Sequence, residues 1–155
     1  MPKPITVMAF DYGTRRVGVA IGNSETGLGQ ALKTIKDIRS QINTMQSKTK
    51  DSAFSKLSNS VLKELTTVEE ALHQTKAKSG QDVLNFPIRL DDKLAGIFES
   101  AVSGYVAPTK QVVAAYEELK GQTNIQLSKL DKVKNEDLKQ LNSLVHTLSI
   151  PVIGN

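Results

Sequence analysis

The chain has 155 residues, of which 39% are apolar and 5% aromatic, and its formal net charge at pH 7 is +4. This length is enough for one domain with a substantial core, which would be built mainly from aliphatic side chains. Cysteine is absent, and this excludes disulfides, thiolate metal sites and a cysteine nucleophile. The lysines are spread along the chain, so the positive charge favours solvated helix faces over a nucleic-acid-binding surface.

Residues 5–23 have the composition of two strands joined by a glycine-containing turn. Ile5–Asp11 is rich in β-formers, and Arg16–Gly22 alternates large with small residues, which is the period of a strand. A ligand or another backbone could come close to the small-residue face. Residues 30–35 are either a third strand or the first turn of a helix. We therefore expect a short β-hairpin or three-strand meander over residues 1–33.

From residue 34 onward, apolar residues recur every three or four positions, which is typical of amphipathic helices. Short connections between such helices favour antiparallel neighbours. The predicted fold class is therefore mainly α, an antiparallel helical bundle over residues 34–155 that follows the β segment. The stripes predict helices over residues 35–45, 54–78, 90–101, 108–130 and 135–148, with Ser79-Gly80 ending the second and Asn135 capping the last.

The N-terminal segment contains a dense motif. Residues 9–22 read Ala-Phe-Asp-Tyr-Gly-Thr-Arg-Arg-Val-Gly-Val-Ala-Ile-Gly, and Ala31-Leu32 and Thr34-Ile35 follow. This run resembles the start of the YqgF-type family of Holliday-junction-resolvase-like, pre-16S rRNA nucleases. The resemblance implies a ribonuclease-H-like fold in which Asp11 is the first catalytic carboxylate. An Asp at a strand end beside a glycine turn can hold a divalent metal near a phosphate.

The remainder of the chain departs from that family. Its strand ending in Gly-Leu-Pro and its later Asp-Glu-Arg segment do not follow here. Residues 38–151 instead resemble the C-terminal helical region of bacterial sortilin-like glycosyl hydrolase proteins. The matching residues are 76–90, 93–95, 107–111 and 117–119. In those proteins a β-propeller is thought to hold the activity, and it is absent here, so this second resemblance implies an accessory role.

The segment Phe86, Pro87, Ile88 and Arg89 is the most distinctive part of the helical region. It is either a docking loop for the missing propeller or a rigid linker whose Phe86 and Ile88 plug the end of the bundle. The two roles are compatible. An exposed aromatic or Ile residue in this segment would indicate an interface.

Two functions follow from these patterns. The preferred one is a non-catalytic helical structural or interaction module that needs no cofactor and binds a protein partner or the missing propeller. The alternative is a Mg²⁺-dependent nuclease that uses Asp11 as catalytic residue and metal ligand, with Arg15 and Arg16 contacting the phosphates of a nucleic acid. The change of resemblance between Thr34 and Ile38 favours a fusion of two fragments.

Other site types find little support in the sequence. His73 and His146 are the only histidines, and neither has a second ligand at a convincing metal-binding spacing. The N-terminal apolar run is too short for a signal peptide, and no segment is long enough to cross a membrane. We therefore expect a cytoplasmic protein without a membrane partner.

Overall fold

The computed structural model describes residues 6–12, 17–23, 27–78, 84–102 and 108–148, and for the two strands it describes the backbone. Most of these residues are helical, so the predicted mainly α fold class is confirmed. The helices are α1 (Leu28–Gln46), α2 (Ser52–Leu72), α3 (Leu90–Val102), α4 (Lys110–Lys132), the π-helical turn η2 (Val133–Asp137) and α5 (Leu138–Thr147).

The backbone of the N-terminal segment forms β1 (Thr6–Tyr12) and β2 (Val17–Asn23), which pair antiparallel. The connection between them, residues 13–16, lies outside the described residues. The alternative of a third strand at residues 30–35 is wrong, because these residues belong to α1. Leu28, Ala31 and Ile35 lie on the buried face of that helix, so the apolar stripe begins a full two turns earlier than the predicted start.

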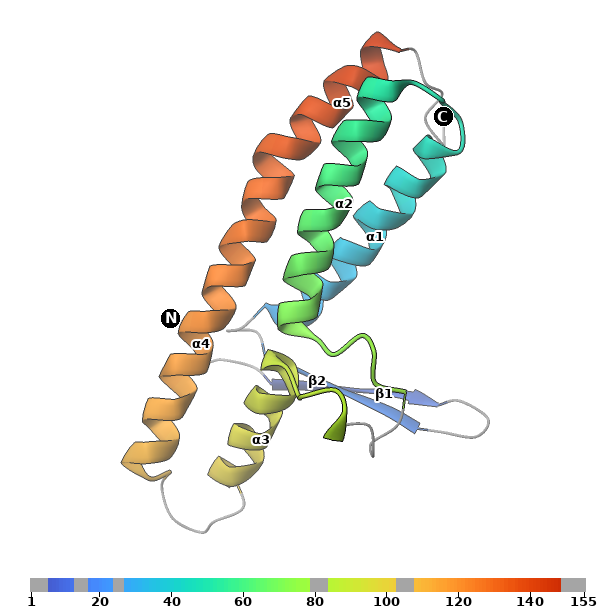
Figure 1. Cartoon of the computed structure of the whole chain (residues 1–155). Coiled ribbons are helices and arrows are strands. Elements are labelled where there is room, and N and C mark those ends of the chain that lie inside the picture. Colours follow the sequence, from blue (N-terminus) through green and yellow to red (C-terminus); the bar gives the residue numbers. More distant parts are fainter. Residues whose placement is uncertain (1–5, 13–16, 24–26, 79–83, 103–107, 149–155) are drawn as a thin grey trace.

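Helix α2 is the centre of the arrangement and contacts α1, α3, α4 and α5. Figure 1 shows α1, α2 and α5 side by side, while α3 lies beside the other end of α4. Helices α4, η2 and α5 follow one another without a break, so residues 110–147 form one long helix along which the others pack. The chain enters α1 at Gly27, whose φ of 58° is left-handed and suits glycine better than any residue with a side chain.

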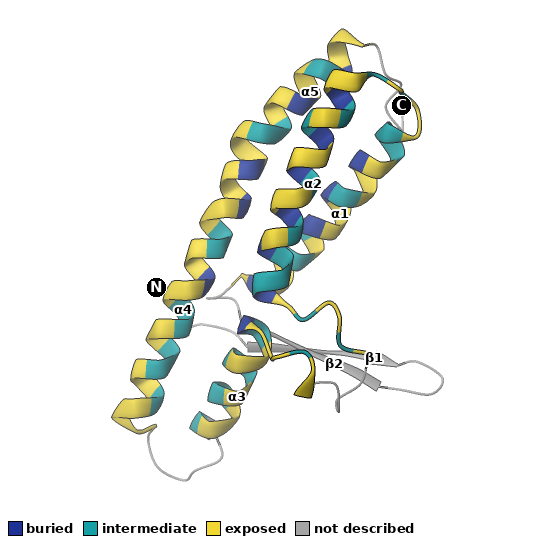
Figure 2. Cartoon of the chain, viewed as in Figure 1, coloured by how far each residue is buried: buried dark blue, intermediate teal, exposed yellow. Residues whose placement is uncertain are grey.

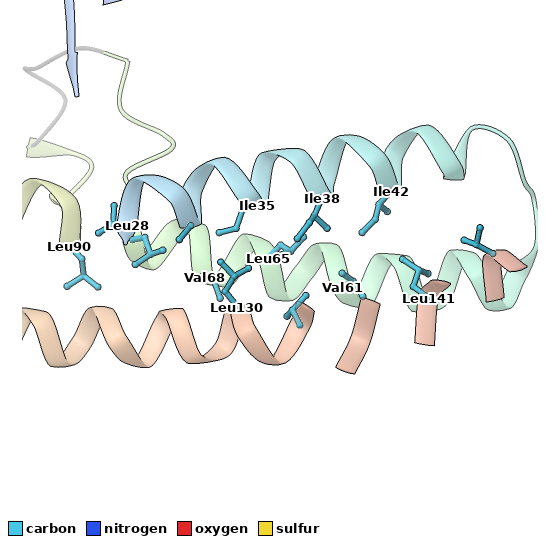
Figure 3. Packing of buried hydrophobic residues seen from close by; sticks show 14 of the residues in the cluster. Leu28, Ile35, Ile38, Ile42, Val61, Leu65, Val68, Leu90, Leu130 and Leu141 are labelled. Atoms are coloured by element: carbon cyan, nitrogen blue, oxygen red, sulfur yellow. The ribbon is translucent and has the colours of Figure 1, made fainter. Parts of the chain in front are cut away.

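The hydrophobic core lies between α1, α2 and the long helix. Figure 2 shows the buried positions of these helices turned toward one another, with exposed positions on the outer faces. In Figure 3, Ile35, Ile38 and Ile42 of α1 point toward α2. Phe54, Leu65 and Leu72 of α2 are completely buried. Aliphatic burial at roughly 25 cal/mol per Å² is the main stabilising contribution of such a core.

The predicted helix over residues 54–78 ends early. Helix α2 stops at Leu72, and His73 has the extended angles φ −137° and ψ 143°. The side chains just after the helix bond to α3 and to the segment before it: His73 Nδ1 contacts Asp91 Oδ2 in the first turn of α3, and Gln74 Nε2 donates to the Pro87 carbonyl at 2.8 Å. These long-range bonds hold residues 73 and 74 in a non-helical conformation. The predicted end of the helix, Ser79-Gly80, lies outside the described residues.

The predicted cap at Asn135 is also wrong. The chain passes through this position inside η2, where the amide of Leu138 donates to the carbonyl five residues earlier, that of Val133. A π turn holds one more residue than an α turn. This extra residue brings Val133, Leu141 and Val145 to buried positions in a continuous helix.

Two completely buried hydroxyl side chains, Ser58 and Thr123, have partners within the bundle. The completely buried Ser58 donates to the Ser55 carbonyl at 3.1 Å and accepts from Gln46 Nε2 at 2.7 Å. The hydroxyl of Thr123, equally buried, donates to the Leu119 carbonyl at 2.9 Å. These bonds remove the cost of burying a hydroxyl without a partner. Among the described helices, none is both long and apolar enough to span a membrane.

Candidate functional site

Asp11, the predicted catalytic residue and metal ligand, is the second-last residue of β1 and pairs with Gly18 of β2. Residues directly opposite in an antiparallel pair share a face, and successive residues of a strand alternate between faces. The register therefore places position 11 on the same face as positions 18, 20 and 22, which are Gly, Ala and Gly. This is the small-residue face that the sequence pattern indicates as open to a ligand.

Arg15 and Arg16, the predicted phosphate contacts, lie outside the described residues. The side chain of Asp11 is likewise not described, so its role and that of the two arginines remain predictions. Mg²⁺ in proteins is commonly held by one or two carboxylates together with waters and substrate phosphates. One carboxylate at the end of β1 fits that donor set as a single ligand.

The other acidic residues that the sequence offers do not form a metal site in the described part of the chain. No group of three His, Cys, Asp or Glu side chains lies together there. Glu64 is exposed on α2, while Asp91 contacts His73. The sequence places Glu69 one turn before His73, but Glu69 instead pairs with Arg39 of α1.

The predicted docking segment connects the end of α2 to the start of α3. Phe86 is half-buried, Pro87 and Arg89 are exposed, and Ile88 is 44% exposed. The interpretation in which Ile88 plugs the end of the bundle is therefore wrong, because half of its surface faces solvent. A docking role for the segment remains a prediction.

Comparison with known proteins identifies relatives that are named as nucleases. A "Putative pre-16S rRNA nuclease" of Polynucleobacter necessarius subsp. necessarius (strain STIR1) is 78% identical over 32 residues, 21% of this chain and 22% of that protein. A protein of the same name from Aeromonas hydrophila is 58% identical over 31 residues, which are 20% of this chain and 22% of that protein. Another, from Pseudoalteromonas translucida (strain TAC 125), is 42% identical over 50 residues, which cover 26% of this chain and 34% of that protein.

These matches are short. The chain spans about a fifth to a third of the length of these curated relatives. No family model matches the chain. No solved structure matches it significantly.

The relatives correct the preferred functional prediction. A non-catalytic module like the C-terminal region of a sortilin-like glycosyl hydrolase protein is contradicted, because the matched proteins bear the name of a nuclease. The comparisons support neither the expected likeness over residues 38–151 nor a fusion with such a protein. The first predicted resemblance, to pre-16S rRNA nucleases over a short segment, is confirmed.

Proposed function

We propose that the chain is a metal-dependent nuclease of the ribonuclease-H-like class that acts on precursor 16S rRNA. The observation that supports this proposal most is the match of 78% identity over 32 residues to a protein named for that activity. The match has nearly the length of the N-terminal run that resembles the same family. In this proposal, β1 and β2 are the first hairpin of the ribonuclease-H-like sheet.

Asp11 is the proposed metal ligand and catalytic residue. Its position near the end of β1, opposite Gly18, leaves the neighbouring position on its face without a side chain. A bound Mg²⁺ would offset the charge of the phosphate and lower the pKa of a coordinated water. The carboxylate of Asp11 would hold the cation beside the strand pair, and RNA phosphate oxygens would supply further ligands.

Arg15 and Arg16 are the proposed phosphate contacts. They follow Asp11 by four and five positions, between β1 and β2. Guanidinium groups bind phosphate through paired hydrogen bonds and stay charged at every physiological pH. In this role they position the RNA strand next to Asp11, and they contribute affinity that falls as the salt concentration rises.

The decisive experiment compares wild type, Asp11→Asn and Asp131→Asn on a precursor 16S rRNA fragment and on branched DNA, with Mg²⁺, Mn²⁺ or EDTA. Asp131 is the matched control, because it is exposed and its pairing with Lys134 is a surface contact within one helix. We expect metal-dependent RNA cleavage by wild type and Asp131→Asn, with a loss of at least about 100-fold in Asp11→Asn, the scale on which essential catalytic groups act. Absence of cleavage by wild type, or equal cleavage by Asp11→Asn, would refute the proposal.

A further inference from the structure

A pocket of about 260 Å³ lies where the end of α2, the start of α3 and the middle of α4 meet. Its wall combines cationic, amide and apolar side chains. None of these side chains belongs to the N-terminal segment that contains Asp11. The residues that matter for its chemistry are Ile88, Arg89, Lys93, Gln122, Ile125 and Gln126.

The first feature of the pocket is a pair of cations. The amide of Lys93 donates to the Arg89 carbonyl at 3.0 Å, so the two residues are one helical turn apart. Neither forms an ion pair with any residue that the structure describes. The nearby carboxylate of Asp91 contacts His73 instead. Like charges at this spacing repel each other, and a bound anion would remove that repulsion.

The second feature is a hydrogen-bond acceptor without a donor. Gln126 Oε1 is buried and has no partner in the described structure. The side-chain amide of Gln122, which also lines the pocket, does have a partner, because its Nε2 donates to Glu118 Oε1 at 3.1 Å. A buried carbonyl oxygen of this kind is stabilised by a ligand that brings an N–H or O–H group.

The third feature is apolar surface that faces solvent. Ile88 is 44% exposed and Ile125 is 57% exposed, and both line the pocket. Ile88 belongs to the connection between α2 and α3, whereas Ile125 belongs to α4. Side chains of this type cover the flat face of a ring or the carbons of a sugar.

We propose that this pocket binds one nucleotide of an RNA strand. Its phosphate contacts Arg89 and Lys93, and its base or ribose lies over Ile88 and Ile125. A base N–H or ribose hydroxyl donates to Gln126 Oε1 after this side chain has rotated to expose the buried oxygen. An anion, an apolar surface and a hydrogen-bond donor occur together in a nucleotide, and RNA offers the 2′-hydroxyl as an additional donor. The choice of RNA rests on the proposed function, because the substrate of the proposed nuclease is RNA. The pocket would then bind the substrate strand through residues that are distant from Asp11 in the sequence.

The test measures binding of a fluorescent single-stranded RNA by anisotropy in EDTA, across a range of salt concentrations. The pocket variant is Arg89→Ala with Lys93→Ala. Its matched control is Lys129→Ala with Lys132→Ala, which removes the same charge from exposed positions of α4. We expect the pocket variant to weaken binding at least tenfold and to reduce the salt slope by about 0.7–1.4, which is one or two phosphate contacts at about 0.7 each. The control should bind within twofold of wild type. Equal weakening in both variants, or none in the pocket variant, would overturn the inference.

A second variant tests the uncharged part of the pocket. Gln126→Leu keeps the size of the side chain but removes the acceptor, so we expect a several-fold loss of affinity with an unchanged salt slope. Circular dichroism checks that the variant is folded. If Gln126→Leu is folded and binds RNA as tightly as wild type, or if an acidic peptide competes with RNA for the pocket, the inference is wrong.

The two proposals fail in different ways. Binding is measured without metal, so it does not depend on cleavage. If RNA binding needs Arg89 and Lys93 but wild type never cleaves, the pocket inference holds and the proposed nuclease does not. If cleavage needs Asp11 while the pocket variants bind and cleave normally, the nuclease holds and the pocket inference fails.

Discussion

Arg39 of α1 bonds to two residues of α2 one turn apart: its Nη2 pairs with Glu69 Oε2, and its Nη1 donates to Thr66 Oγ1 at 3.1 Å. The Glu69 side chain is 14% exposed and that of Arg39 is 31% exposed. This network lies beside the apolar contact between the two helices. It fixes how far one helix can slide along the other, because a guanidinium group binds its acceptors in a planar geometry.

Replacing Arg39 tests how much this pair contributes. We expect Arg39→Met to lower the free energy of unfolding by about 1–2 kcal/mol, because it leaves the half-buried Glu69 without its donor. A double-mutant cycle with Glu69→Gln should give a coupling of about 1 kcal/mol. The same cycle on the exposed pair Asp131 and Lys134 should give only about 0.3 kcal/mol. Urea denaturation measures both, and equal couplings would contradict this account.

Core truncations should differ with depth. Leu65 is completely buried, whereas Leu119 is only half-buried at the edge of the core. We expect Leu65→Ala to cost about 2–5 kcal/mol of unfolding free energy, and Leu119→Ala to cost clearly less, because part of its surface already faces water. Leu84→Ala is the control, since Leu84 is 92% exposed and should change stability by less than about 0.5 kcal/mol. Chemical denaturation measures the unfolding free energy of each variant. A larger loss of stability for Leu119→Ala than for Leu65→Ala would contradict the placement of Leu65 in the core.

Two helix caps allow a matched comparison. Asp51 Oδ1 accepts from the amide of the buried Phe54 at 2.7 Å, at the start of α2. Thr109 Oγ1 accepts from the amide of Val112 at 3.3 Å, at the more exposed start of α4. We expect Asp51→Ala to cost about 1–2 kcal/mol and Thr109→Ala about 0.5 kcal/mol, because the shorter bond holds a helix end against the core. Thermal unfolding followed at 222 nm distinguishes them, and equal losses would show that burial has no influence here.

The π turn predicts an unusual tolerance to deletion. Removing the exposed Asn135 would let η2 become regular α-helix, with Leu138 four positions after Val133 and both still facing the core. We expect this deletion to cost less than about 1 kcal/mol. Deleting the exposed Asn124 of α4 should instead unfold or severely destabilise the chain, since every later residue would rotate by about 100°. Circular dichroism and chemical denaturation of the two deletion variants measure the difference in stability. Comparable destabilisation would mean that η2 does not arise from one extra residue in the helix.

The local features of the chain follow from its sequence. The spacing of Ile35, Ile38 and Ile42 predicts a helix with one buried face, and the structure places all of them in the core. Periodicity suffices here because a helix must bury its apolar stripe whatever its neighbours are. Asp11 is likewise proposed as a site residue from the sequence alone, because its motif is contiguous.

Contacts between elements could be decided only by the tertiary structure. The early end of α2 depends on His73 and Gln74 bonding to the first turn of α3 and to the segment before it, and nothing near them in the sequence indicates those partners. The pocket is built from side chains of α2, of the α2–α3 connection, of α3 and of α4. These side chains meet only when the helices pack with one particular rotation and register. Amphipathic periodicity fixes which face of a helix is buried, but the pairing of polar side chains across helices depends on offsets of a few ångströms, which the packed core determines.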